Sequence, residues 1–377
     1  MTEKSNYKSL RSERKFDWYI GVYGNSLWTL AGIPVREYYL NPNACIEAYR
    51  KGRPLVRELF GDATTPPIPI LSPMIKYGHV STIGAKLNFP EGGEVHHTPP
   101  FASIDEGIKR LKEHIDFASS GMTPYYLEFY KKLQDAFTDE KVHLGWQWEG
   151  PITTVWELLG ANFMYDLFDK PDSLREFMKL STASIVEYCR FFCKIENTEV
   201  LNPEPDRGRL CDDIAAMVPS KMWPDFVLPF WNMFYDGPTP GRILHCEDMR
   251  AEQLEHLEKI SVVDYDPGIS SKLNPKLINE GTRVPFGWRL GGFHYSSMTC
   301  QDVEDFVYQA AADGANYVHT HIEAAMCDED TAKKVRAFVK AARETKNLVD
   351  KGASRDEIAR RVTPAGKEKF WNNWLGK

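Results

Sequence analysis

The chain has 377 residues, of which 42% are hydrophobic and 26% are charged, and its formal net charge is −7. This composition is typical of a globular protein with a large core. The acidic balance excludes the basic surface that would bind nucleic acid or an anionic membrane, and no apolar run approaches the roughly 18 residues of a membrane-spanning helix. The length suits one α/β barrel domain, although it would also permit two domains.

The cysteines and the first residues of the chain indicate where the protein works. Seven cysteines are scattered along the sequence with no signal peptide before them, so we expect a reducing cytoplasm and no disulfide framework. Residues 1–15 are rich in Lys, Arg and Glu and are expected to form a solvated arm. A homo-oligomer is compatible with the sequence, which does not specify the oligomeric state.

The first half of the chain already alternates strands with helices. Apolar runs predict strands at residues 16–22, 67–71 and 142–150, and helical spacing predicts helices at residues 42–60, 104–117 and 173–194. The strand at 142–150 ends in a Gly-Pro turn, and the helix at 173–194 follows the turn signal at residues 170–172. His96 and His97 lie in a Pro/Gly-rich stretch and are expected to be exposed.

In the last third of the chain the alternation is regular. Strands are predicted at residues 242–247, 261–265, 284–288 and 316–321, each followed by a helix at residues 251–260, 273–280, 301–312 and 331–345. This βαβα order predicts a parallel sheet covered by helices. Catalytic groups gather at the carboxyl ends of such strands. The residues near these ends, which we expect to face one cleft, are His245, Glu247, Trp288, His321 and Cys327.

Several segments, taken in order, resemble the uroporphyrinogen decarboxylase superfamily, which includes zinc-dependent methyltransferases of corrinoid-linked methyl transfer. The matching segments cover most of the chain and lie at residues 31–44, 59–62, 84–90, 149–160 and 212–223. The resemblance implies a single (β/α)8 TIM barrel over residues 1–377 with an N-terminal extension. It places the active site in the mouth of the barrel.

One departure from the family pattern narrows the expected activity. Decarboxylases of the superfamily carry an arginine-rich signature near the N-terminus for the carboxylates of a tetrapyrrole, whereas residues 18–25 here contain no arginine. Tyr19 and Tyr23 in this stretch suggest a neutral aromatic wall instead. Such a wall suits an apolar or aryl substrate better than a polyanion.

The resemblance also implies a catalytic zinc ion. The zinc branch uses a His-x-Cys pair after the sixth strand and a later Cys, and His245 with Glu247 in place of the first Cys is the best match here. Cys327 is the candidate for the third ligand, with His321 as an alternative. Residues two apart on a strand share a face, so His245 and Glu247 can converge. A carboxylate in place of a thiolate favours a Lewis acid acting on an ether oxygen.

The expected reaction is therefore cleavage of a methyl ether, in particular a methoxylated aromatic, with transfer of the methyl group to the cob(I)alamin of a separate corrinoid protein. Candidate catalytic residues are Glu149, Asp213 and His294, and candidate ring-packing residues, besides Tyr19 and Tyr23, are Trp146, Trp148 and Trp288. The tryptophans could equally be core residues, and Asp213 could belong to a helix cap. Alternatives are methyl transfer from a methylcorrinoid to a thiol, a decarboxylase-like lyase, and a non-catalytic subunit that binds a corrinoid protein.

Overall fold

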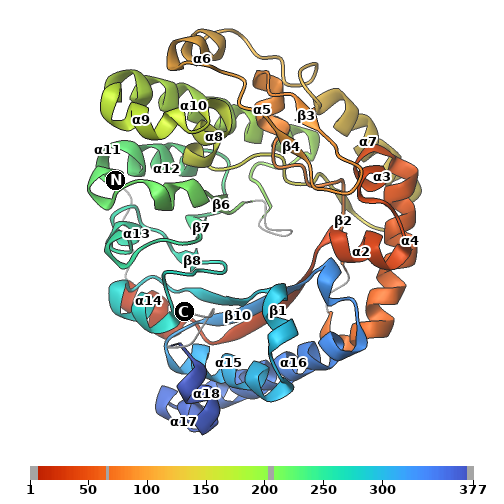
Figure 1. Ribbon diagram of the computed structural model, residues 1–377, viewed down its shortest axis with the longest axis vertical. Helices are drawn as coiled ribbons and strands as arrows, with labels where there is room; N and C mark the ends of the chain where they lie inside the picture. The colour runs from red at the N-terminus through yellow and green to blue at the C-terminus, as the bar shows by residue number, and fades with distance from the viewer. Residues whose placement is uncertain (1–6, 65–67, 203–207, 372–377) are drawn as a thin grey trace. The chain divides into compact units, whose positions relative to one another are not determined.

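A computed structural model describes residues 7–64, 68–202 and 208–371 (Figure 1). Contacts within the chain group it into two compact units. The first unit comprises residues 1–33, 47–68 and 247–377, and the second comprises residues 34–46 and 69–246. The expectation of a single domain stays a prediction.

In the first unit, a strand from the beginning of the chain pairs in parallel with a strand from near its end. Its strands are β1 (Asp17–Val22), β8 (Asp264–Asp266), β9 (Gly287–Leu290) and β10 (Tyr317–Ile322). β10 pairs in parallel with both β1 and β9, and Tyr265 next to Phe286 forms a parallel bridge. The register sets Tyr19 beside His319 and Gly21 beside His321. Aromatic and histidine side chains of the two strands therefore share one face.

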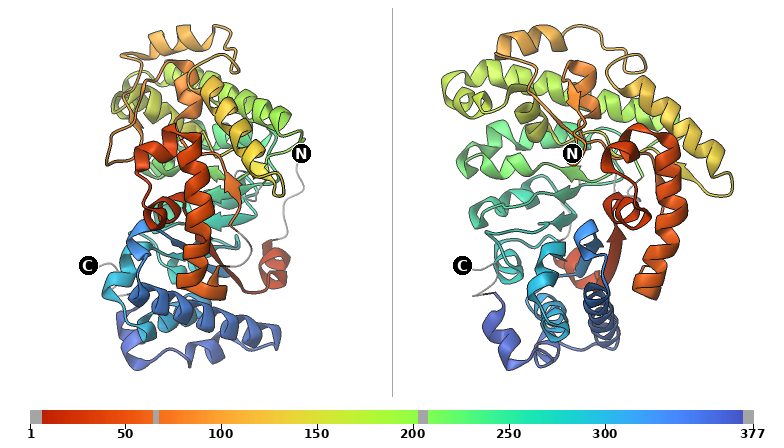
Figure 2. Two further views of the ribbon diagram at one scale, coloured as in Figure 1. Left: turned by 90° about the vertical axis from the view of Figure 1, so that its right-hand side faces the viewer. Right: turned by 45° about the vertical axis from the view of Figure 1, so that its right-hand side comes forward.

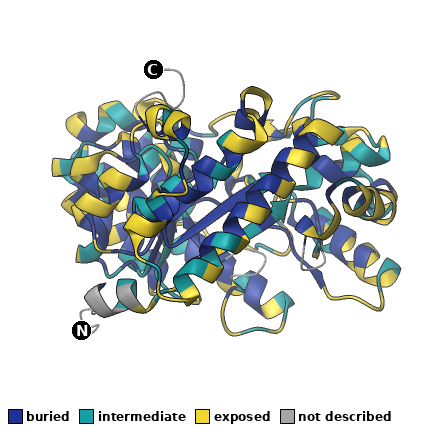
Figure 3. Ribbon diagram, turned by 90° about the horizontal axis from the view of Figure 1, so that it is seen from below, coloured by how far each residue is buried: buried dark blue, intermediate teal, exposed yellow. Residues whose placement is uncertain are grey.

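Helices precede and follow these strands along the chain. They are α1 (Tyr7–Glu13), α2 (Gly24–Ala31), α13 (Glu255–Lys259), α14 (Pro275–Gly281), α15 (Cys300–Ala312), α16 (Glu329–Asp350), α17 (Arg355–Ala359) and α18 (Pro364–Lys369), with α4 (Pro42–Phe60) shared between the units. Short 3-10 turns are η1 (Gly61–Ala63), η4 (Ala251–Gln253), η5 (Gly292–Ser297) and η6 (Ala324–Met326). α15 and α16 pack side by side against β10 and β1 (Figure 2). Their buried residues recur at helical spacing, so each helix has one buried and one exposed side (Figure 3).

The second unit combines parallel strand pairs, an antiparallel hairpin and helices. Its strands are β2 (Ile70–Leu71), β3 (Leu87–Asn88), β4 (His96–His97), β5 (Val142–His143), β6 (Leu210–Cys211) and β7 (Ile243–His245). β2 pairs with β5 and β6 pairs with β7, both in parallel, whereas β3 and β4 form an antiparallel hairpin. The sequence did not predict the hairpin.

The helices of the second unit surround these strand pairs. They are α3 (Val35–Leu40), α5 (Gly78–Ile83), α6 (Ile104–Leu111), α7 (Thr123–Ala136), α8 (Pro151–Leu159), α9 (Asn162–Asp169), α10 (Pro171–Ile195), α11 (Trp223–Phe226) and α12 (Leu228–Tyr235), with 3-10 turns η2 (Asp213–Met217) and η3 (Ser220–Met222). α10 packs against α6, α8 and α12. Its fully buried side chains, such as Phe177 and Ile185, form the core of the unit.

Two features of the chain as a whole bear on the sequence predictions. Residues 1–6 of the expected solvated arm lie outside the described residues, whereas residues 7–13 form α1, which buries Tyr7 and donates from the Arg11 guanidinium to the carbonyl of Thr282 at 2.9 Å. Among the helices that the structure describes, none combines the length and apolar character needed to cross a membrane.

Candidate active site

Acidic side chains gather around one lysine where the strands of the second unit end. Lys76 follows β2, and its Nζ lies 3.2 Å from Oε1 of Glu149, which follows β5. The Glu149 side chain is 8% exposed and the Lys76 side chain 65% exposed, so solvent reaches the pair from the lysine side. The charges that act on this pair include Glu157, Asp212 and Asp213. We call these five residues, Lys76, Glu149, Glu157, Asp212 and Asp213, the acid–lysine cluster.

Lys76 lies next to Glu149 because the backbone after β2 packs closely against the backbone after β5. The N–H of His79 donates to the carbonyl of Gln147 at 2.7 Å. Gly78 lies so close to Gln147 that an added Cβ would be 2.6 Å from the Gln147 Cβ. Only glycine fits there, so the segment after β2 lies directly against the segment after β5.

Asp212 has a structural role within the cluster. Its carboxylate is fully buried and accepts hydrogen bonds from the backbone N–H groups of Ile152 at 3.1 Å and Thr153 at 2.6 Å, and from the indole of Trp231 at 2.6 Å. Ile152 and Thr153 lie in the first turn of α8, where N–H groups have no partner within the helix. Burial raises the pKa of Asp212 to about 6, although these hydrogen bonds oppose the shift. Asp212 therefore anchors the start of α8 to β6.

Asp213 and His245 face each other beside this anchor. The Nε2 atom of His245, at the end of β7, lies 3.7 Å from Oδ1 of Asp213. Their side chains are 17% and 46% exposed, respectively. The structure thus brings two of the predicted site residues together, within the unit that also holds Glu149.

The electrostatics of the cluster make Glu149 a proton donor near neutral pH. Burial raises the pKa of its carboxyl to about 7; the charge of Lys76 opposes this shift, and Asp213 and Asp212 add to it. Burial, and then the charge of Glu149, raise the pKa of Glu157 well above its usual value. Glu149 therefore titrates near neutral pH, which is the range in which a general acid is most effective.

The first unit contains a second group of charged side chains, which we call the arginine cluster. It comprises Arg289, Glu323, Glu247, Asp266 and His319. A terminal nitrogen of Arg289 lies 2.8 Å from Oε1 of Glu323, and Nε2 of His319 lies 3.3 Å from Oδ1 of Asp266. Burial lowers the pKa of Arg289, but the charges of the surrounding groups outweigh burial and raise it. These groups are Tyr23, Glu323, Asp266 and Glu247. Arg289 is therefore permanently charged.

The predicted aromatic wall exists, but it is not neutral. Tyr19 stacks on His319 with ring centroids 4.6 Å apart, and Tyr23 stacks on His321 at 4.5 Å. The guanidinium of Arg289 lies over the Tyr23 ring at 5.6 Å from its centroid. The sequence around Tyr19 and Tyr23 lacks arginine, yet β9 supplies one by tertiary contact, which corrects the expectation of a neutral wall.

The other predicted metal ligands of the first unit have protein partners. Oε1 of Glu247 accepts the backbone N–H of Ile269 at 3.1 Å. The Cys327 thiol donates to the carbonyl of Glu323 at 3.6 Å, and burial raises its pKa to about 11. Among residues 7–64, 68–202 and 208–371, no group of three or more His, Cys, Asp or Glu side chains is arranged to hold a metal ion.

His294 is held as a neutral imidazole. Its Nδ1 accepts the backbone N–H of Gly291 at 3.2 Å, and burial lowers its pKa to about 4. The proton of the neutral ring is therefore on Nε2, which is the donor tautomer. The structure places His294 in η5 of the first unit.

The three candidate tryptophans differ in exposure. Trp148 is 1% exposed and packs on Phe192 with centroids 5.2 Å apart, and Trp288 is 1% exposed and packs on Trp371 at 5.5 Å. Both rings belong to the cores of their units. Trp146 is partly exposed, and its indole donates to the carbonyl of Trp148.

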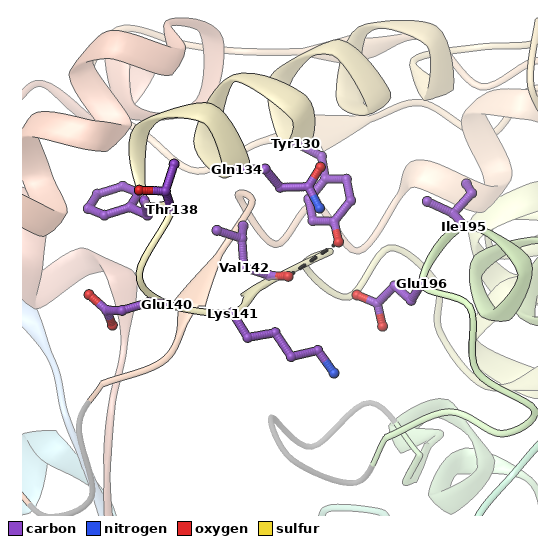
Figure 4. A pocket seen from close by; sticks show the side chains of 9 residues that line it. Tyr130, Gln134, Thr138, Glu140, Lys141, Val142, Ile195 and Glu196 are labelled. Carbon is purple, nitrogen blue, oxygen red and sulfur yellow. Dashed lines mark hydrogen bonds between the residues drawn. The ribbon is translucent and has the colours of Figure 1, made fainter.

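A hollow of about 360 Å³ lies elsewhere in the second unit (Figure 4). It is lined at the start of β5 by Lys141 and Val142, and by the ends of α7 and α10. The Tyr130 hydroxyl donates to the Val142 carbonyl at 3.2 Å on its wall. This hollow lies at the amino end of β5, whereas Glu149 follows the carboxyl end, so it is not part of the acid–lysine cluster.

Sequence reasoning identified Glu149 and Asp213 but missed Lys76, Glu157 and Arg289. Lys76 follows a predicted strand, which is the position where catalytic groups gather, and that signal could have identified it. Glu157 lies on a helix, and Arg289 becomes relevant only through the pairing of β9 with β10. The sequence around Glu157 or Arg289 therefore contains no pattern that marks either of them as a site residue.

Comparisons with known proteins agree with this architecture. A structure of a methyltransferase from Methanosarcina mazei matches with a TM-score of 0.64 at 18% sequence identity, over 90% of this chain and 97% of that one. At this identity the match shows a shared fold. No curated protein matches by sequence comparison. The family model of uroporphyrinogen decarboxylase (URO-D) matches residues 29–280, about two thirds of the chain. The chain therefore belongs to the uroporphyrinogen decarboxylase family.

Proposed function

We propose that this chain is a methyltransferase that cleaves the methyl ether of a methoxylated aromatic and passes the methyl group to the cob(I)alamin of a separate corrinoid protein. Membership of the URO-D family and the fold shared with a methyltransferase support the general class. The observation that carries the proposal is the buried Glu149 carboxyl, 3.2 Å from Lys76, with a pKa of about 7. We also infer that the parallel strands belong to one (β/α)8 barrel, as the pairing of β1 with β10 suggests.

The chemistry requires an acid because an alkoxide or phenolate is a poor leaving group. When the bond between the methyl carbon and oxygen breaks, both bonding electrons stay on oxygen. Phenols have a pKa of about 10, so a carboxyl with a pKa of about 7 can transfer its proton to the departing oxygen. The reduced corrinoid on the partner supplies the electron pair that forms the new bond to the methyl carbon.

The residues around Glu149 assist the proton transfer in two ways. After transfer, the Glu149 carboxylate is paired with the Lys76 ammonium at 3.2 Å, which stabilises the new negative charge. Burial and the charge of Glu149 raise the pKa of Glu157, which favours its neutral form and limits the negative charge beside that carboxylate. Asp213 beside His245 is a further acid–base pair within the same unit, and we propose that it orients the substrate.

Zinc binding by His245 and Glu247, with Cys327 or His321 as the third ligand, stays a prediction. Among residues 7–64, 68–202 and 208–371 no group of three or more His, Cys, Asp or Glu side chains is arranged to hold a metal ion, and the proton transfer above is derived from the side chains alone. The test is elemental analysis of the purified protein and of His245→Ala. The prediction requires about one zinc per chain, lost in the variant without a change in the circular dichroism spectrum. Equal zinc in both proteins would refute the assignment of His245.

The proposed function is tested by supplying the substrate and the acceptor together. Purified protein, a reduced corrinoid protein and 2-methoxyphenol should give catechol and methylated corrinoid in equal amounts, and omission of the corrinoid protein should abolish both products. Rapid methylation of a thiol by methylcobalamin, with no methoxy-aromatic consumed, would instead establish the thiol methyltransferase. Loss of carbon dioxide from an aromatic or tetrapyrrole acid would establish a decarboxylase.

A further inference from the structure

Two aromatic side chains border the acid–lysine cluster and have no part in the chemistry described above. Tyr77 directly follows Lys76, and His97 lies on β4 of the antiparallel hairpin. Their ring centroids are 4.5 Å apart and the rings are inclined at 61°. Both residues are half-buried. They form an edge-to-face pair that still presents surface to a ligand.

Tyr77 lies next to the reacting groups. Its backbone position is fixed by Gly78 and His79, which hold this segment against Gln147. The charges that act on its hydroxyl are, in order of size, those of Glu157, Lys76, Glu149 and Glu94. Three of these four, Glu157, Lys76 and Glu149, are members of the acid–lysine cluster. Tyr77 also adjoins Lys76 in the chain, and the Lys76 Nζ lies 3.2 Å from Glu149, so Tyr77 lies beside the cluster.

The hairpin holds His97 in place from the other side. β3 and β4 pair Leu87 with His97 and Asn88 with His96, so the two histidines point to opposite faces. His96 is exposed and contacts Asn88 at 2.9 Å, whereas His97 turns inward to Tyr77. The expectation that both histidines are exposed therefore holds for His96 and is wrong for His97.

The hairpin is itself anchored to α3. The Tyr39 hydroxyl donates to Oε2 of Glu94 at 2.9 Å, and the Tyr39 ring lies 6.4 Å from that of Phe89. Tyr39 is buried, so the contact fixes the loop between β3 and β4. His97 is thus held on a supported segment, as a residue that shapes a binding site must be.

The pair is uncharged at neutral pH. Burial lowers the pKa of His97 below its ordinary value, and burial raises that of Tyr77. Two neutral, half-buried rings beside an acid match a flat, uncharged ring whose ether oxygen points to the acid. They offer no ion-pairing group to an anionic substituent.

We propose that Tyr77 and His97 form an aromatic subsite that packs against the substrate ring beside Glu149 and selects aryl over alkyl methyl ethers. The placement of the ether oxygen at Glu149 rests on the proposed function. The ring preference is a property of binding and does not require methyl transfer. Aromatic pairs contribute about 0.5–1.5 kcal/mol beyond area burial, which corresponds to a preference of about two- to ten-fold.

The test compares two ligands that differ only in the ring. Calorimetry on the full chain should show that 2-methoxyphenol binds about two- to ten-fold more tightly than 2-methoxycyclohexanol. Tyr77→Leu and His97→Leu should remove this preference, and Tyr77→Phe, which keeps the ring, should retain it. His96→Leu is the matched control on the same strand and should behave as the unmodified protein does. Circular dichroism checks the fold of each variant.

Three results would overturn the subsite: equal binding of the two ligands by the unmodified protein, no binding of either, or an unchanged preference in both Leu variants. The result is separable from the proposed function. A ring preference in a protein that never demethylates leaves the subsite standing and rejects the methyltransferase. Demethylation without a ring preference rejects the subsite and leaves the methyltransferase standing.

Discussion

The acid–lysine cluster and the arginine cluster each pair one cation with a carboxylate at about the same distance, 3.2 Å for Lys76 with Glu149 and 2.8 Å for Arg289 with Glu323. Their behaviour differs because of the surroundings. Burial raises the pKa of Glu149 to about 7; Lys76 opposes this shift, and the carboxyl groups of Asp213 and Asp212 add to it. Arg289 has its pKa raised by the charges around it and cannot release a proton. The first cluster is therefore suited to proton transfer and the second to stability.

The sharpest way to test this division is to neutralise the carboxyl in each cluster. Glu149→Gln should lower kcat for demethylation by about 10²–10⁴-fold, because a general acid contributes about that much. Glu323→Gln is the matched control; it should lower the free energy of unfolding while kcat stays within about three-fold, which is less than about 1 kcal/mol of barrier. An equal loss of kcat in both variants would remove the distinction between the clusters.

Removing the cation of the arginine cluster should affect stability. Arg289→Met leaves Glu323 partly buried without its 2.8 Å partner, so we expect a loss of about 1–3 kcal/mol in the free energy of unfolding. The control is Lys346→Met, which breaks the exposed pair with Asp17 and should cost about 0.5 kcal/mol. Urea denaturation measures both. A smaller loss for Arg289→Met than for Lys346→Met would contradict a structural role for Arg289.

Removing the cation of the acid–lysine cluster should move a pH profile. Glu149 acts while protonated, so activity is present below its pKa and is lost as the pH rises through about 7. Lys76 lowers that pKa, so Lys76→Met should shift the alkaline limb of kcat/KM upward by about 1–3 pH units. Lys76→Arg keeps the charge and should keep the profile. A downward shift in Lys76→Met would show that Glu149 is not the titrating acid.

The raised pKa of Glu149 also makes the free energy of unfolding depend on pH, with a smaller effect than on activity. The direction of this dependence follows from the direction of the pKa shift. Glu149 has a higher pKa in the folded chain than the ordinary carboxyl value of 4.5. Its stabilising contribution is therefore fully present below about pH 4.5 and is lost as the pH rises through about 7. Glu149→Gln should flatten this part of the dependence of unfolding free energy on pH, as measured by urea denaturation between pH 4 and pH 8.

Long amphipathic helices were predictable because their signal lies within one segment. The helix predicted at residues 42–60 is α4, and those at 173–194, 301–312 and 331–345 lie within or coincide with α10, α15 and α16 to within a few residues. The strand expected at 142–150 is only Val142–His143; beyond it the N–H of Gly145 donates to the side-chain hydroxyl of Ser72 at 2.8 Å and not to a backbone carbonyl of a neighbouring strand. Apolar spacing cannot tell a strand from an extended segment that carries a site residue.

The acid in the site was predictable, whereas its partners were not. Glu149 follows a predicted strand, which is a local signal. Lys76 meets it across 73 residues of sequence, and the meeting depends on Gly78 lying against Gln147. His97 was expected in an exposed loop because the two-residue strands of the hairpin leave no periodic pattern. Pairings between distant segments are fixed by packing, and the sequence of either segment alone does not encode them.

The central claim is that Glu149 holds a proton at neutral pH, and infrared spectroscopy tests it most directly. The difference between spectra of the unmodified protein and Glu149→Gln isolates the carbonyl stretch of the protonated Glu149 carboxyl. The account predicts that this band is present at pH 5 and disappears with a midpoint at about pH 7. A midpoint near 4.5, the ordinary value for a glutamate, would contradict it.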